Sequence, residues 1–372
     1  MNRFLAAATA LCLVLACNDP DAMRPAAAPR AVLATDIPGI AVLTWNVYVG
    51  AEVERVLQAQ TPDEAVAIAT EEWARVRATN FPARAGLIAA GIAAAGPQLV
   101  GLDEVALYRV TDRPFEELAT QVAYDFLQLV IDSLHARGLE YGVGAVDRTT
   151  DIQVPVIAGF DAAGQPILAG VRFTDGDAVL VQAGVPYANP RSAAYDAHQT
   201  VTLGGVTTGV YQGWSSVDAT LAGTTYRVVA THLAGQEARV IQLGQTRELI
   251  ALLEREARPT ILVGDFNSDA DGADPSRATP TYGMLRAAGF GDSWIDPDRT
   301  APGLTCCEQP DLRNPRPTLD QRIDFVFARH FPERSLVVRR QVLGDRQSDR
   351  TAGLWPSDHA AVVATFLTPP VR

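Results

Sequence analysis

The chain contains no lysine, so all 31 of its basic side chains are arginines. Arginine suits bidentate contacts with phosphate, but coding rich in G and C gives the same bias, and we favour this compositional explanation. The 43 acidic residues outnumber the arginines and give a formal net charge of −12. An acidic surface repels phosphate unless arginines or a metal ion act locally. The composition therefore argues against non-specific binding to nucleic acid, although it does not exclude a nuclease.

Only four cysteines are present, and their positions exclude a disulfide framework. Apart from Cys12 and Cys17, the only cysteines are Cys306 and Cys307, and neighbours in sequence cannot connect distant parts of a fold. In an oxidising compartment this pair can close on itself as a vicinal disulfide, or the two side chains can simply be small and buried. Two adjacent thiols alone are too few for a metal site.

A hydrophobic run long enough to cross a membrane is also lacking. The apolar segment from Phe4 to Ala16 follows Arg3 and is too short for a span, but it is typical of an export signal. It ends in Val-Leu-Ala-Cys17, which resembles a bacterial lipobox whose cysteine becomes lipidated; a plain secretory signal is the alternative.

These signals divide the chain into three parts. We expect an export signal at 1–17, a flexible tether rich in Ala, Pro and Asp at 18–35, and one folded domain at 36–372. The protein should therefore leave the cytoplasm, either as a membrane-anchored lipoprotein or as a periplasmic or extracellular protein.

Helical and strand patterns alternate along the folded part. Caps and apolar spacing predict helices at 61–78, 82–95, 115–136 and 238–257. Short apolar, β-branched runs predict strands at 40–47, 98–102, 178–182, 217–221, 226–231, 260–263, 322–328 and 360–366. Strands interleaved with helices and hairpins indicate mixed sheets covered by helices in a single domain.

Polar side chains follow or precede many of these apolar strands, where a rigid scaffold can direct them into one cleft. Taken singly, each is more often a turn former or a structural residue than a functional one. The set consists of Asn46, Glu104, His232, Asp265, Asn267, Asp324, Asp358 and His359.

The combination of residue types indicates a metal site beside acid and base groups. It supplies carboxylates, amides and histidines without thiols, and such oxygen ligands suit Mg²⁺, Mn²⁺ or Ca²⁺ rather than zinc. The sequence has no Gly-x-Ser-x-Gly motif and no glycine-rich phosphate loop. A serine hydrolase would therefore lack its nucleophile.

The order of motifs resembles that of the endonuclease/exonuclease/phosphatase superfamily, which includes deoxyribonuclease, bacterial sphingomyelinases and inositol polyphosphate 5-phosphatases. The motifs are TWN at 44–46, GLDE at 101–104, THL at 231–233, GDFNSD at 264–269, RIDFVF at 322–327 and SDH at 357–359. The chain departs from the family at Asp103, where glutamine is usual. Asp177 is the candidate for a further polar position that the family has before the THL motif.

The resemblance implies a role for each residue. Glu104 would bind the metal directly, with Asn46 and Asp358 close to it as inner or outer ligands. In-line attack on an anionic ester needs such charge compensation.

The same resemblance implies the catalytic residues. Asp265 would position or deprotonate the attacking water, and Asn267 would hold that water or a phosphate oxygen. His359, oriented by Asp324, would act as an acid or base or as a charge beside the phosphate, and His232 would stabilise the phosphoryl oxygens.

The implied fold is an α/β (α+β) four-layer sandwich, in which two mixed sheets pack face to face with helices outside. The implied function is an exported metal-dependent phosphoesterase that hydrolyses a phosphodiester or phosphomonoester. Alternatives are an extracellular nuclease and a non-catalytic binding lipoprotein of the same fold. We expect a monomer that meets the membrane only through a lipid on Cys17, with specificity determined by loops within 140–212 and 270–319.

Overall fold

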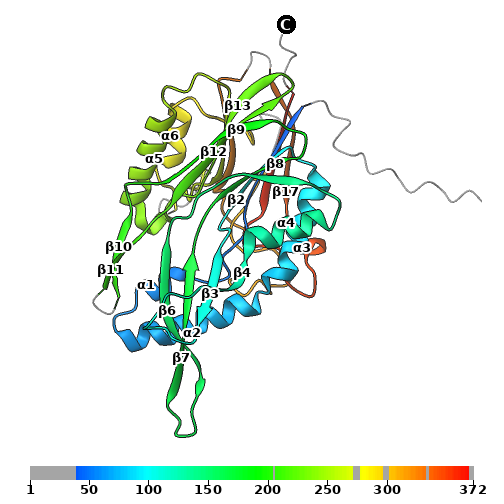
Figure 1. Ribbon diagram of the computed structural model, residues 1–372. Coiled ribbons are helices and arrows are strands. Elements are labelled where there is room, and N and C mark those ends of the chain that lie inside the picture. The colour runs from blue at the N-terminus through cyan, green and yellow to red at the C-terminus, as the bar shows by residue number, and fades with distance from the viewer. Residues whose placement is uncertain (1–38, 204–205, 271–276, 296–300, 332–334, 368–372) are drawn as a thin grey trace, which may run out of the picture.

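The computed structural model describes residues 39–203, 206–270, 277–295, 301–331 and 335–367 (Figure 1). The predicted export signal and tether lie outside this part of the chain. No helix among the residues described is long and apolar enough to cross a membrane.

Two six-stranded mixed sheets form the centre of the molecule. The first has the order β17 (Leu336–Leu343), β18 (Ala361–Leu367), β1 (Ile40–Asn46), β2 (Leu99–Asp103), β8 (Ala178–Gln182) and β5 (Tyr141–Val146). The second has the order β15 (Gly291–Asp292), β16 (Asp324–Arg329), β14 (Thr260–Asp265), β13 (Thr224–Thr231), β12 (Gly213–Leu221) and β9 (Tyr187–Ala194). Only the neighbours β1 and β2 in one sheet and β13 and β14 in the other run parallel.

Alternation along each strand places its apolar side chains in two different cores, one between the sheets and one beneath the outer helices. In β1, Val42 packs between the sheets, whereas Leu43 and Trp45 face the helices outside. In β14, Ile261 and Val263 likewise face the first sheet, and Leu262 faces outward. Successive side chains of a strand point to opposite faces, so this pattern buries both faces of both sheets.

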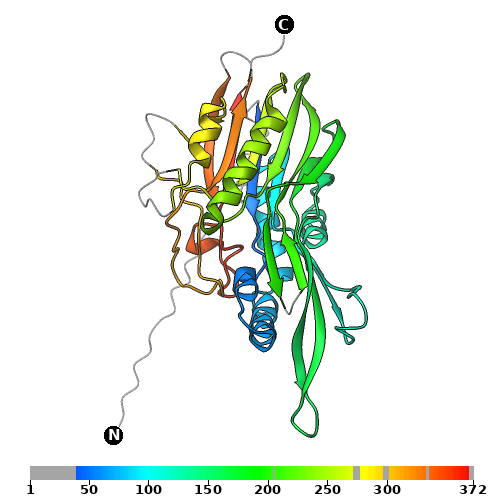
Figure 2. The same ribbon diagram turned by 90° about the vertical axis from the view of Figure 1, so that its left-hand side faces the viewer.

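Helices cover the outer faces and complete four layers, as predicted. The first sheet is covered by α3 (Phe81–Ala95) and α4 (Phe126–His135), and the second by α5 (Arg239–Leu253) and α6 (Thr281–Ala287). Figure 2 shows the yellow-green helices α5 and α6 outside the second sheet. Single turns of 3₁₀ helix occur at Gln236–Ala238 and Gln347–Asp349.

A smaller antiparallel sheet extends the sandwich at the end that contains the site. Its order is β4 (Gln121–Asp125), β3 (Leu107–Thr111), β7 (Pro166–Thr174) and β6 (Asp151–Phe160), and the β6–β7 hairpin projects from the molecule (Figures 1 and 2). Helices α1 (Val53–Leu57) and α2 (Pro62–Ala78) contribute apolar side chains to the same core as this sheet. A separate ribbon consists of β10 (Gln199–Leu203) and β11 (Val206–Val210).

The predicted helix at 115–136 is wrong in its first half. Residues 121–125 form β4, which pairs with β3, and the helix begins only at Phe126. The side chain of Asp125 caps it by accepting a hydrogen bond from the backbone N–H of Gln128 at 3.1 Å. The ring of Tyr124 contacts that of Trp73, with centroids 6.1 Å apart, so tertiary pairing overrides the helical pattern here.

Candidate active site

Strand alternation directs polar side chains from both sheets toward one another. Asn46, Asp103 and Asp265 each lie an even number of residues after an inner-face apolar residue of β1, β2 or β14. Asp324 begins β16 and lies two residues before the inner-face residue Val326. Each side chain therefore faces the opposite sheet. The Asn46 Nδ2 donates to Asp265 Oδ2 across the interface at 3.2 Å, and the backbone N–H of Asp265 donates to Asp103 Oδ2 at 2.9 Å.

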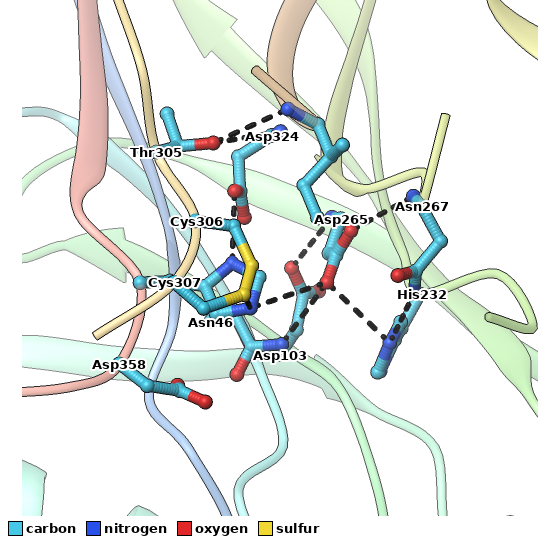
Figure 3. Close-up of polar contacts among 12 residues, drawn as sticks. Asn46, Asp103, His232, Asp265, Asn267, Thr305, Cys306, Cys307, Asp324 and Asp358 are labelled. Atoms are coloured by element: carbon cyan, nitrogen blue, oxygen red, sulfur yellow. Dashed lines mark hydrogen bonds and ion pairs between the residues drawn. A yellow bond between two sulfur atoms is a disulfide. The ribbon is translucent and has the colours of Figure 1, made fainter. Parts of the chain in front are cut away.

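Asp265 is the centre of the cluster. Its Oδ2 lies 3.6 Å from His232 Nε2 and 3.8 Å from His359 Nε2, and its Oδ1 accepts from the backbone N–H of Asn267 at 2.8 Å. Figure 3 shows Asp265 between Asn46 and His232. Burial, together with the charge of Asp324, raises the pKa of Asp265 to about 6. The carboxyl group can therefore exchange a proton near neutral pH.

His359 forms a dyad with Asp324. Its Nδ1 lies 2.9 Å from Asp324 Oδ2, so the carboxylate fixes the ring and leaves Nε2 facing Asp265. Burial alone would lower the pKa of His359, but the carboxylates of Asp324 and Asp265 raise it well above its ordinary value. The imidazole is consequently a cation that can donate to an anionic oxygen. Thr305 Oγ1 accepts from the backbone N–H of Asp324 at 3.3 Å and holds the dyad from behind (Figure 3).

His232 and Asn267 form the other wall of the cluster. The two side chains meet at 3.1 Å, and Asn267 Nδ2 also donates to the carbonyl of Leu233 at 2.9 Å. Burial would lower the pKa of His232, but the charges of Asp265 and Glu104 raise it. His232 therefore adds a second imidazole that can be protonated on the same side of Asp265.

Glu104 is fixed by two hydrogen bonds to its carboxylate. Asn46 Nδ2 donates to it at 2.8 Å and the backbone N–H of Val49 at 2.6 Å. The amide oxygen of Asn46 accepts from the backbone N–H of Tyr48 at 3.0 Å, so Asn46 presents its nitrogen to the carboxylates. This arrangement makes Asn46 a group that positions Glu104.

Three residues around the site have left-handed backbone conformations. Tyr48, Glu104 and Asn267 have φ values of 62°, 61° and 49°. Such conformations cost residues other than glycine of the order of 1 kcal/mol each, and they cluster at functional sites. The backbone is therefore held in a strained conformation where Glu104 and Asn267 enter the cleft.

Asp358 lies on the segment that precedes β18. Burial raises its pKa to about 7, although the charge of His359 opposes this shift. The neighbouring Ser357 Oγ donates to the backbone carbonyl of Asn46 at 2.7 Å, which ties this segment to the end of β1. Asp358 thus shares a cleft with Glu104, as predicted.

Further buried carboxyl groups support this arrangement. Asp177, the predicted additional position, accepts from the backbone N–H of Glu104 at 3.3 Å, and Asp147 accepts from that of Asp177 at 2.8 Å. Asp175, which the sequence analysis did not select, lines the cleft, and burial with the charge of Glu104 raises its pKa to about 6. Asp103, at the position where the family usually has glutamine, lies on the inner face of β2. From there it accepts the backbone N–H of Asp265.

A cleft of about 400 Å³ is lined by Glu104, His232, Asp265, Asn267, Asp358 and His359, among other residues. Seven carboxyl groups contribute to its lining, whereas no arginine does among the residues described. The acidic residues are Glu52, Glu54, Glu104, Asp175, Glu237, Asp265 and Asp358. Of these seven, Asp265 is buried, whereas Glu54 and Glu237 are exposed at the rim. The concentration of carboxylate oxygens fits a hard divalent cation, and Glu104 and Asp358 could hold it.

All eight predicted site residues lie together. Six of them line the cleft directly, and Asn46 and Asp324 contact that group through the hydrogen bonds to Glu104 and His359. Both predicted specificity segments reach the same cleft, through residues such as Phe173.

The second of these segments contributes Cys306 and Cys307, whose sulfurs form a disulfide (Figure 3). Of the two alternatives that the sequence allows for this pair, the structure has the vicinal disulfide. Its position in the cleft wall places sulfur atoms beside the histidine–aspartate dyad.

A model of the Endonuclease/Exonuclease/phosphatase family matches residues 43–359. Comparison with curated proteins finds no significant match. Among solved structures, an endonuclease/exonuclease/phosphatase protein from Beutenbergia cavernae is 18% identical with a TM-score of 0.52, covering 90% of this chain and 73% of that one. A family protein from Leptotrichia buccalis is 14% identical, with a TM-score of 0.50 and coverages of 88% and 99%. TDP2 from D. rerio, complexed with a single-strand DNA product, is 15% identical with a TM-score of 0.50 and the same coverages.

Proposed function

Because the chain belongs to the Endonuclease/Exonuclease/phosphatase family, we propose that it is a metal-dependent phosphoesterase that uses water to hydrolyse a phosphodiester or phosphomonoester. The observation that supports this proposal most strongly is the position of Asp265, whose Oδ2 lies within 4 Å of the Nε2 atoms of both His232 and His359. A base between two imidazoles can direct a water at a phosphorus atom whose oxygens the imidazoles bind.

Asp265 acts as the base in this proposal. Its pKa of about 6 makes it a carboxylate at neutral pH that is basic enough to take a proton from an attacking water. The side-chain amide of Asn46 and the backbone N–H of Asn267 both donate to Asp265 and hold its carboxylate in position. In-line attack then requires the leaving oxygen to face away from Asp265.

The His359–Asp324 dyad supplies positive charge. His359 donates from Nε2 to a phosphoryl oxygen, and Asp324 stabilises the imidazolium without leaving its hydrogen bond. His232 approaches the same region from the second sheet and stabilises the charge that grows on the oxygens.

A divalent cation such as Mg²⁺, held by Glu104 and Asp358, would neutralise the phosphate charge and polarise a phosphoryl oxygen. The chain's own contribution is to orient these carboxylates. Asn46 and the Val49 N–H fix Glu104, and the Ser357 hydroxyl ties the segment that carries Asp358 to the end of β1. Mn²⁺ and Ca²⁺ bind the same kind of oxygen ligands.

The charge of the cleft favours a substrate with one or two phosphates. Seven carboxyl groups line it without a compensating arginine among the described residues, and a polyanionic strand would meet repulsion along this wall. TDP2 from D. rerio is complexed with single-strand DNA, but the likeness to it is one of fold. A nuclease is accordingly the second candidate.

A turnover screen tests the proposal. Purified protein with Mg²⁺ should release nitrophenol from bis-nitrophenyl phosphate, and EDTA should abolish the release. Sphingomyelin, inositol phosphates and plasmid DNA, assayed in parallel, distinguish a small or lipid substrate from a nucleic acid. Absence of turnover with every ester and cation would contradict the proposal and favour a binding lipoprotein; cleavage of DNA alone would favour the nuclease.

We also propose that the enzyme is exported and anchored through Cys17, with residues 18–35 as the tether. A membrane anchor suits a lipid or surface substrate. The wild-type protein expressed in bacteria should partition into detergent, and Cys17→Ser should release it into the aqueous phase. Equal membrane association of the two proteins would contradict the anchor while leaving the enzymatic proposal intact.

A further inference from the structure

The Cys306–Cys307 disulfide contacts the dyad that the proposed function uses. Cys307 Sγ lies 4.0 Å from Nε2 of His359. The backbone fixes this approach, because the N–H of Ala360 donates to the carbonyl of Thr305 at 2.8 Å and the two strands form a bridge at Cys306 and His359. Both cysteines line the cleft, where Cys306 is buried and Cys307 is half-buried, so a reductant would attack through Cys307.

We propose that reduction of this disulfide creates a site for a soft divalent cation such as Zn²⁺ or Cd²⁺, with Cys306 Sγ, Cys307 Sγ and His359 Nε2 as ligands. A dithiol reductant transfers two electrons and two protons to the sulfur–sulfur bond, gives two thiols and is itself oxidised to a disulfide. The incoming cation then displaces the two thiol protons and the proton on Nε2. Oxidation of the pair removes the site.

The three ligand atoms are already close enough. All of them lie within 4.8 Å of one another. In a tetrahedral zinc site, with Zn–S of about 2.3 Å and Zn–N of about 2.0 Å, neighbouring ligand atoms are about 3.5–3.8 Å apart. The 4.0 Å between Cys307 Sγ and His359 Nε2 therefore needs only a small adjustment. A fourth position opens toward the cleft, where water or Asp265 Oδ2, 3.8 Å from Nε2, can complete the tetrahedron.

The surroundings of His359 suit a metal ligand. Asp324 binds Nδ1 at 2.9 Å, so a neutral ring has its lone pair on Nε2, which lies 4.0 Å from Cys307 Sγ. A carboxylate that orients a ligating imidazole in this way is a common feature of zinc sites. Thiolates select soft cations, whereas Mg²⁺ prefers the oxygen ligands around Glu104. The two kinds of cation would therefore occupy different places in one cleft.

This site has a consequence for activity, and that consequence rests on the proposed function. A cation on Nε2 of His359 occupies the atom that would donate to the phosphoryl oxygen. The oxidised enzyme would hydrolyse its substrate in the presence of zinc, whereas the reduced enzyme would be inhibited.

Cadmium binding to the full chain tests the site without reference to activity. The oxidised and the dithiothreitol-reduced wild type are freed of reductant and titrated with Cd²⁺, with ultraviolet sulfur-to-cadmium charge-transfer absorption and equilibrium dialysis as readouts. The matched control is the reduced double variant Cys306→Ser, Cys307→Ser, which keeps Cys12 and Cys17. The reduced wild type should bind about one Cd²⁺ per chain more than the oxidised protein and the double variant.

Equal binding by the reduced and the oxidised wild type would overturn the proposal, and this comparison does not depend on the folding of a variant. The role of His359 is tested separately in reduced His359→Ala, where cadmium affinity should fall by at least about tenfold. Unchanged affinity would overturn the three-ligand site.

Zinc inhibition of hydrolysis is measured last, in excess Mg²⁺. The reduced enzyme should need at least about tenfold less Zn²⁺ for half inhibition than the oxidised enzyme. Equal sensitivity would refute the inhibitory role. Cadmium binding by a protein that hydrolyses no phosphoester would instead refute the proposed function and leave the metal site standing.

Discussion

At the scale of single residues, His359 is the side chain whose loss should affect turnover most. It is buried, bonded to Asp324 and adjacent to Asp265. His359→Ala removes a donor to the phosphate, and we expect kcat to fall by about 10²–10⁴-fold with little change in folding. Steady-state kinetics with bis-nitrophenyl phosphate and far-ultraviolet circular dichroism measure the two effects.

The matched control is His135→Ala. His135 is exposed at the end of α4 and pairs only with Glu140, at 2.7 Å. Its loss should leave kcat unchanged within about twofold, because general acid–base effects are confined to groups within hydrogen-bond reach of the substrate. A loss of less than tenfold in His359→Ala would contradict the assigned role.

The raised pKa values of the buried carboxyl groups predict how stability depends on pH and metal. The pKa of Asp265 is raised to about 6 and that of Asp358 to about 7, so the metal-free folded state holds protons that the unfolded state has already released. Its stability is therefore greatest below about pH 4 with respect to these groups and falls as pH rises to about 7. A bound cation replaces those protons.

Mg²⁺ should consequently raise the melting temperature more at about pH 8 than at about pH 5.5, since protons compete with the metal at the lower pH. Scanning calorimetry at both values checks this. Glu104→Gln should reduce the Mg²⁺-dependent increase at the higher pH. An equal increase at both values would mean that these carboxylates do not hold the cation.

The proximity of the eight candidate residues could be predicted because each stands at a strand end within a short, ordered motif. Period-two alternation is visible in the sequence, and it also places Asp103 on the inner face of β2. The sequence does not show in the same way which side chains from distant segments contact these residues. Nothing local in the sequence indicates that Thr305 binds the backbone of Asp324, or that the Cys306–Cys307 pair lies against His359, because these contacts come from a long irregular segment.

At the scale of elements, α3 positions the site through a buried arginine. Arg84 is inaccessible to solvent and donates to the carbonyls of Thr79, Val47, Tyr48 and Pro356 at 2.6–3.1 Å. Burial lowers its pKa to about 10, which still leaves it charged at neutral pH. Arg84 thus joins the helix to the segments after β1 and before β18.

Arg84→Met should destabilise the protein by at least about 3 kcal/mol, because several buried carbonyls lose their donor. Urea unfolding measures the change. Arg137→Met is the control, since Arg137 is exposed and bonds only the carbonyls of Ser133 and Gly86, and it should change stability by less than about 0.5 kcal/mol. Similar losses in both variants would contradict the role of Arg84.

The element that sequence patterns mispredicted shows where local reasoning fails. Residues 121–125 have the composition of a helix that continues into α4, yet they pair with β3 in a sheet that also contains β6 and β7. Strand pairing of this kind depends on residues distant in sequence. By contrast, α2 has its complete start signal in four residues, and Thr61 caps it by accepting from the N–H of Glu64 at 3.2 Å, as predicted.

At the scale of the whole molecule, Gly101 leaves no room for a larger side chain between the two sheets. A methyl group added there would overlap Cγ2 of Val263 in the opposite sheet. Gly101→Ala should therefore separate the sheets locally and cost about 1–3 kcal/mol of stability. Turnover should fall as well, because Asn46 and Asp265 meet across the same interface.

Gly86→Ala provides the opposite expectation. Gly86 lies within α3, and an added Cβ would meet nothing within 4 Å. Alanine in a helix interior is favoured over glycine by about 0.5–1 kcal/mol, so this variant should be more stable than the wild type at unchanged kcat. Destabilisation of both variants, or of neither, in urea titrations would show that sheet separation is not what Gly101 controls.

The pairing of β1 with β18 has a consequence for biosynthesis. Asn46 ends β1, and the Ser357 hydroxyl that bonds its carbonyl is 311 residues further along the chain. A ribosome therefore makes Asn46 and Glu104 long before it makes Asp358 and His359. Until then the edge of β1 that faces away from β2 has no partner, and the first sheet and the cleft remain incomplete. Because the last strand must enter beside the first, we expect folding to be slow, post-translational and sensitive to aggregation at that edge.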